Sequence, residues 1–75
     1  MPKRYSSREI LTALHKAGFV DVSQKGSHLK LRKSGSARTL TVIVKHPANA
    51  IPVGTFRSIL KQAELTLAEF EQLLK

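Results

Sequence analysis

Apolar residues follow two different periods along this chain, and the change of period separates a first helix from the strands after it. Helical spacing comes first, at Ile10, Leu11, Leu14 and Ala17. Ser6 and Glu9 have the spacing of a capping box, and Gly18 supplies the backbone freedom that ends a helix. The pattern predicts a helix over about residues 7–17, preceded by a frayed basic arm at residues 1–5.

From residue 20 onward the apolar period is two, which is the period of β-strands. In the first strand, one side carries Val20 and Val22, and the other carries Asp21, Ser23 and Lys25. In the next two strands, which begin after Gly26 and at Thr39, the apolar side carries Leu29, Leu31, Leu40, Val42 and Val44. With a turn at Lys33-Ser34-Gly35-Ser36, these segments predict an antiparallel meander.

Helical spacing returns after His46-Pro47, which ends the third strand at Lys45 and begins a loop over residues 46–53. A second helix over about residues 54–63 has its apolar side at Phe56, Ile59, Leu60 and Ala63. A second capping box, Thr66 to Glu69, begins a short final helix whose apolar side carries Phe70, Leu73 and Leu74. Phe56 and Phe70 are therefore interpreted as core residues.

The element order α-β-β-β-α-α predicts an α+β fold with helices on one face of a three-stranded antiparallel sheet. We expect one domain over residues 1–75. The other face of the sheet is then open and presents the polar side of the last two strands: His28, Lys30, Arg32, Thr41, Ile43 and Lys45.

The charge of the chain indicates a binding partner that is negatively charged, because the formal net charge is +8. Residues 1–38 carry nine basic and two acidic side chains, whereas residues 39–75 carry four and three. Such a basic surface is typical of proteins that bind a phosphate backbone, although a solvated basic face or an acidic protein partner fits the same charge. The chain has no cysteine and no apolar run long enough to span a membrane. We therefore expect a cytoplasmic protein with no membrane partner.

The candidate chemistry lies at Gly26-Ser27-His28, where a glycine turn aims a histidine from the start of a strand onto the open face. Free imidazole titrates near pH ~6.5 and can carry a proton in the cell, although an ordinary polar strand residue has the same pattern. His46 is interpreted as a loop residue and His15 as a helix-surface residue. Three scattered histidines do not make a metal site, so we expect neither metal nor cofactor.

Several segments, in this order along nearly the whole chain, resemble the HicA toxins of bacterial and archaeal toxin–antitoxin pairs. These are Gly18-Phe19, Gln24-Lys25-Gly26-Ser27-His28, His46, the run from Gly54-Thr55-Phe56-Arg57-Ser58 to Ile59-Leu60-Lys61-Gln62-Ala63, Leu65-Thr66 and Glu69-Phe70. The resemblance implies a fold like the double-stranded RNA-binding domain and a translation-independent mRNA interferase, an endoribonuclease that arrests growth. It also implies that His28 is catalytic. The implied partners are mRNA and a HicB antitoxin, which masks the site and contacts operator DNA on behalf of the complex.

RNA cleavage without a metal commonly uses the ribose 2′-hydroxyl as the nucleophile, and His28 then acts as base or acid. Lys25 and Lys30 lie close to His28 in sequence and can offset the charge that develops on the phosphate. Gly26 allows close approach of the backbone, and Ser27 completes the turn or donates to phosphate. The full set of expected RNA-binding residues is Lys25, Gly26, Ser27, Lys30, Arg32 and Lys45.

Two other functions remain open at this point. A non-catalytic RNA-binding module can use such a fold to bind A-form RNA by its shape and phosphates. Double-stranded RNA-binding domains usually place a lysine cluster at the start of the helix after the sheet, and residues 53–57 here contain one basic residue, Arg57. The third candidate is a protein-binding module whose basic face docks an acidic partner, which is compatible with a toxin that an antitoxin covers.

Overall fold

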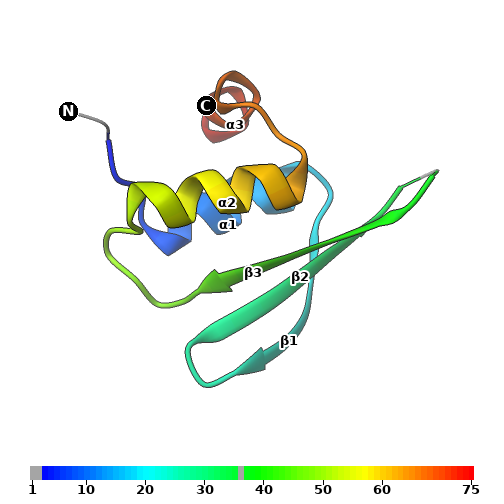
Figure 1. Cartoon of the computed structure of the whole chain (residues 1–75), viewed down its shortest axis with the longest axis horizontal. Coiled ribbons are helices and arrows are strands. Elements are labelled where there is room, and N and C mark those ends of the chain that lie inside the picture. The colour runs from blue at the N-terminus through cyan, green and yellow to red at the C-terminus, as the bar shows by residue number, and fades with distance from the viewer. Residues whose placement is uncertain (1–2, 36) are drawn as a thin grey trace.

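A computed structural model describes residues 3–35 and 37–75, and its elements follow the expected order (Figure 1). Helix α1 (Ser7–Lys16) precedes three strands, β1 (Val20–Lys25), β2 (His28–Ser34) and β3 (Thr39–Lys45). Helices α2 (Val53–Ala63) and α3 (Leu67–Leu74) complete the chain. The α+β class and the order of elements predicted from sequence are confirmed. No helix in the described part of the chain is long and apolar enough to cross a membrane.

Local sequence signals fix both ends of α1. The Ser6 hydroxyl accepts a hydrogen bond from the Glu9 backbone N–H, and the Glu9 carboxylate accepts one from the Ser6 N–H. These bonds satisfy two of the donors that the first turn of a helix leaves free. At the other end, Gly18 has a φ of 106° and the Phe19 N–H donates to the carbonyl of Leu14 at 2.9 Å. This reversal buries the Phe19 ring and leads the chain into β1.

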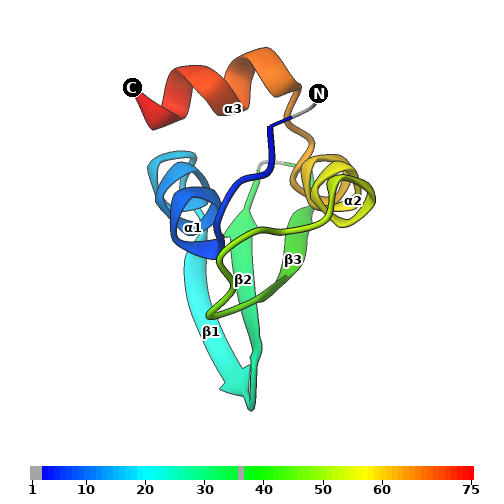
Figure 2. The same cartoon turned by 90° about the vertical axis from the view of Figure 1, so that its left-hand side faces the viewer.

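The three strands form one antiparallel sheet in the order β1-β2-β3, with helices on one face only (Figure 2). Leu29 and Leu31 of β2 and Val42 and Val44 of β3 are buried beneath the helices. Their neighbours in the strands point to the other face, because side chains alternate along a strand. The expected open face therefore exists, and it lies opposite the helices.

The alternation expected for β1 is wrong. All six residues of this strand are exposed, and Val20 keeps 61% of its surface accessible. The register shifts between Asp21 and Ser23, which is a β-bulge at Val22. The extra residue reverses the faces on either side of it, so Val20 lies opposite Arg32 and shares the open face with it. The valine therefore packs against no helix.

The turn between β2 and β3 lies two residues later than the predicted Lys33–Ser36 segment, because β2 continues through Ser34 and β3 begins at Thr39. Ser36 lies outside the described residues. The Gly35 N–H donates to the Arg38 carbonyl at 2.9 Å, and the Arg38 guanidinium pairs with Glu64 at the end of α2. The hairpin tip is thereby tied to the helical layer.

Helix α3 forms a third layer above α1 and α2 (Figures 1 and 2). A capping box begins it, since the Thr66 hydroxyl accepts from the Glu69 N–H and the Glu69 carboxylate accepts from the Thr66 N–H. Phe70 is completely buried and packs edge-on against Phe56 of α2, with ring centroids 4.9 Å apart. Both phenylalanines are core residues, as expected.

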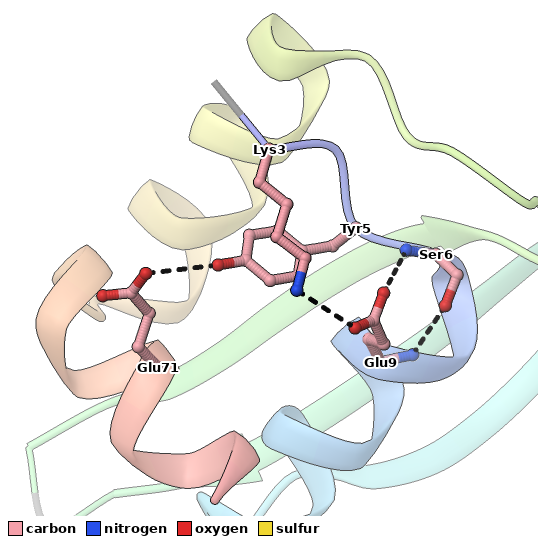
Figure 3. Close-up of polar contacts among 5 residues, drawn as sticks. All are labelled: Lys3, Tyr5, Ser6, Glu9 and Glu71. Carbon is pink, nitrogen blue, oxygen red and sulfur yellow. Dashed lines mark hydrogen bonds and ion pairs between the residues drawn. The ribbon is translucent and has the colours of Figure 1, made fainter. Parts of the chain in front are cut away.

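The basic arm is not frayed over its described part, residues 3–5 (Figure 3). Tyr5 is only 5% exposed and its ring lies 4.9 Å from those of Phe56 and Phe70. Its hydroxyl donates to the Glu71 carboxylate at 3.3 Å, while Lys3 pairs with Glu9 at 3.9 Å. The side chain of Tyr5 thus packs into an aromatic cluster with Phe56 and Phe70. The basic composition of the arm did not predict this contact. Residues 1–2 lie outside the described part.

Candidate active site on the open sheet face

The turn between β1 and β2 consists of Gly26 and Ser27, and it places His28 at the first position of β2. Gly26 has a φ of 57°, in the left-handed region that a glycine adopts without steric cost. His28 is exposed and belongs to the polar side of the strand, opposite Leu29. The turn lies at the end of the sheet far from α3, so no described helix covers it (Figure 2).

Two lysines from the neighbouring strands flank His28. Lys25 of β1 is its partner on one side, and Lys45 of β3 is its partner on the other. Residues directly opposite one another in antiparallel strands have Cβ atoms about 4.5–5.5 Å apart and point to the same face. Lys25, His28 and Lys45 therefore form a row across the sheet, which we call the histidine row.

A second row lies directly beside the first, made of Ser23, Lys30 and Ile43. Together with Lys25 and His28 these residues line a shallow hollow of about 160 Å³. The structure thus brings Lys25, Lys30 and Lys45 together around the imidazole. Arg32 shares the face but lies four positions along the strand from His28, about 13 Å away at the usual rise per residue.

The open face is cationic because the acidic residues lie elsewhere. Asp21 is the one carboxylate in a strand, and it pairs opposite Leu31, on the side of the sheet that faces the helices. Its carboxylate contacts the His15 Nε2 at 2.8 Å. The remaining carboxylates belong to the helices or their ends. Within residues 3–35 and 37–75, no group of three or more metal-ligating side chains comes together.

Backbone contacts hold the turn that carries His28. The His46 N–H donates to the carbonyl of Ser27 at 2.7 Å. The Gln24 side-chain amide donates to the Gly26 carbonyl at 3.3 Å and contacts the His46 carbonyl at 3.4 Å. Both turn residues are therefore linked to the end of β3.

The other two histidines stand apart from the hollow. His46 points toward α1, where its Nδ1 lies 2.7 Å from the hydroxyl of Ser7. Ser7 is only 2% exposed, and its hydroxyl also accepts from the Ala48 N–H at 2.9 Å. His15 is exposed on α1 and bound to Asp21. Neither imidazole belongs to the histidine row.

Sequence reasoning missed three contributors to this region. Ser23 lines the hollow on the side of β1 that it shares with Lys25, as alternation indicated, but it was not named as a site residue. Gln24 and Ser7 contact His46, and Ser7 is far from His46 in sequence. No spacing rule predicts such contacts between distant segments. The positive φ at Gly26 was predictable, because glycine between two strand patterns is a turn signal.

The chain matches a known protein family over most of its length. The family model described as HicA toxin of bacterial toxin-antitoxin matches residues 7–65 of the chain. The match begins with α1 and includes the whole sheet, the turn at Gly26 and helix α2. No curated protein matches the chain. Because the family match covers most of the sequence, the chain belongs to the HicA toxin family and is the toxin component of a bacterial toxin–antitoxin system.

Proposed function

We propose that this toxin is an endoribonuclease that cleaves mRNA by acid–base catalysis at His28, and that a HicB-type antitoxin neutralises it. The observation that carries the proposal is the histidine row, in which an exposed imidazole stands between Lys25 and Lys45 on an open sheet face. An imidazole supplies a proton carrier, and the flanking ammonium groups supply charge complementary to phosphate. The family match supports the same reading.

In the proposed reaction the ribose 2′-oxygen attacks the adjacent phosphorus as the bond from phosphorus to the 5′-oxygen breaks. One proton leaves the 2′-hydroxyl and one reaches the departing 5′-oxygen, so the products are a 2′,3′-cyclic phosphate and a 5′-hydroxyl. His28 performs one of these two transfers. The nucleophile belongs to the substrate, so this mechanism needs no metal or cofactor.

Lys25, Lys30 and Lys45 are proposed to bind the phosphate and to stabilise the negative charge that develops on it in the transition state. Such charge stabilisation is effective when the cations are already in place before the reaction. Arg32, at the far end of the face, is proposed to contact a more distant phosphate. Gly26 and Ser27 are proposed to let the RNA backbone approach the turn closely.

The antitoxin is proposed to cover the open face, because that face holds the proposed catalytic residue and the basic side chains of Lys25, Lys30, Arg32 and Lys45. An acidic protein surface complements these side chains and excludes RNA from the same site. Through this complex the toxin would reach operator DNA indirectly.

Expression in bacteria tests the proposed function. Induction of the wild-type chain from a tight promoter should stop growth and fragment mRNA, and the neighbouring antitoxin gene should prevent both. His28→Ala should abolish both effects, whereas His15→Ala is the matched control because His15 lies on α1, away from the open face. Tight binding of duplex RNA without cleavage would instead identify a non-catalytic module.

A further inference from the structure

His46 is connected to the candidate site through its backbone and to α1 through its ring. Its N–H donates to the Ser27 carbonyl at 2.7 Å, and this carbonyl belongs to the peptide bond that joins Ser27 to His28. Its Nδ1 lies 2.7 Å from the Ser7 hydroxyl, and Ser7 is the first residue of α1. A continuous set of hydrogen bonds thus runs from the start of α1 to the turn of the proposed active site.

The hydrogen bonds around Ser7 join the start of α1 to the segment after β3. The Ser7 hydroxyl accepts from the Ala48 N–H at 2.9 Å and shares a second hydrogen bond with the His46 Nδ1 at 2.7 Å. The Ser7 N–H also donates to the Ala48 carbonyl at 2.9 Å, so Ser7 holds the segment after β3 at two points.

We propose that the bond between Ser7 and His46 positions the Gly26-Ser27 turn, and with it the imidazole of His28, for RNA cleavage. This inference rests on the proposed function. His46 acts in it as a positioning residue whose task is to hold the hydrogen bond between its Nδ1 and the Ser7 hydroxyl, and it carries no proton for the reaction. A displacement of about 1 Å at a reacting group can cost 10²-fold in rate, so the anchoring of this turn matters for catalysis.

Asparagine separates positioning from proton transfer at residue 46. Its side-chain amide places either an acceptor oxygen or a donor N–H close to the position of Nδ1, so it can keep a bond to the Ser7 hydroxyl, but it does not titrate. We expect His46→Asn to retain the cleavage rate of the wild type within about threefold, while His46→Ala and Ser7→Ala each lower kcat about tenfold at unchanged KM. The double variant Ser7→Ala/His46→Ala should be no slower than the slower single variant, because both changes remove one interaction.

Hydrogen exchange provides a readout that does not depend on RNA cleavage. In Ser7→Ala and His46→Ala the backbone amide of residue 46 should exchange faster than in the wild type, while amides in the centre of β2 remain protected. This measurement decides the link between Ser7 and the turn even if the wild-type chain cleaves no RNA, a result that would refute the proposed function alone. His46→Ala keeps the buried Ser7 in place and serves if Ser7→Ala does not fold.

Two results would overturn the inference. The first combines two observations: His46→Asn cleaves RNA as slowly as His46→Ala, and a folded Ser7→Ala variant cleaves it at the wild-type rate. Together they would make His46 a proton carrier. The second is unchanged exchange of the residue 46 amide in both variants that lack the bond.

Discussion

His28 receives one of its two flanking charges from a nearby residue and the other from a distant one. Lys25 precedes it on the same hairpin, whereas Lys45 reaches it only through the pairing of β2 with β3. The sequence assigned both lysines to RNA binding from their types and their strand positions. That they lie directly opposite His28 on two sides depends on register, which a single sequence specifies only through its apolar pattern.

The salt dependence of RNA binding tests the role of these lysines. Lys25→Ala and Lys45→Ala should each weaken binding of a short single-stranded RNA and lower the slope of log K against log salt by about 0.7, the value for one lost phosphate contact on a single strand. Lys61→Ala is the matched control, because Lys61 is exposed on α2, in the helical layer. Fluorescence anisotropy at several salt concentrations measures the slope, and an unchanged slope for both variants would exclude them as phosphate ligands.

Ionisation of Tyr5 is expected to lower the stability of the folded protein at alkaline pH. Burial, and then the adjacent Glu71 carboxylate, raise the pKa of Tyr5 above its ordinary value of 10.0. The folded state therefore retains the phenolic proton at pH values where the unfolded chain releases it. The stability contributed by the neutral ring is complete below pH 10.0 and falls as the pH rises through the higher folded value.

We expect the free energy of unfolding of the wild type to decrease more steeply above pH 10.0 than that of Tyr5→Phe. Urea titrations across that range compare the two proteins, and phenylalanine keeps the contacts with Phe56 and Phe70. Parallel pH profiles for the two proteins would contradict the burial of an un-ionised tyrosine.

Among the elements, helices were predicted better than strands. Each capping box is a local signal of four residues, and both boxes form as the sequence indicated. The prediction for strand β1 was wrong because of the bulge between Asp21 and Ser23. Apolar and polar residues still alternate in the sequence, but the extra residue puts Val20 on the face opposite to the one that regular alternation predicts. The exposure of both faces of β1 was therefore not predictable from its valines.

The fully buried side chain of helix α3 is Phe70, which packs against Tyr5 and Phe56. Phe70→Ala should lower the free energy of unfolding by about 3–5 kcal/mol, which is a large part of the stability of a domain of this size. Leu67→Ala on the same helix is the control, since Leu67 is 49% exposed, and it should cost less than about 1 kcal/mol. Chemical denaturation measures both, and equal losses would mean that Phe70 does not hold the helix.

At the scale of the whole molecule, one face of the sheet forms the core with the helices and the other face carries the candidate site. The helices bury the apolar face of β2 and β3, and they leave the cationic face free. This division was predictable, because period-two burial and amphipathic helices permit few other arrangements. Contacts between distant segments were not, and these include the Tyr5 cluster, the pair of Arg38 with Glu64, and the bond of Ser7 to His46.

The central claim is that the imidazole of residue 28 carries a proton in RNA cleavage, and the cleavage rate of purified protein tests it most directly. Wild type, His28→Ala and His15→Ala are incubated with one RNA at equal concentration, after circular dichroism has shown that all three are folded. We predict that His28→Ala is slower by about 10²–10⁴-fold, the usual contribution of general acid–base catalysis, and that His15→Ala matches the wild type. A folded His28→Ala protein that cleaves as fast as the wild type would contradict the account.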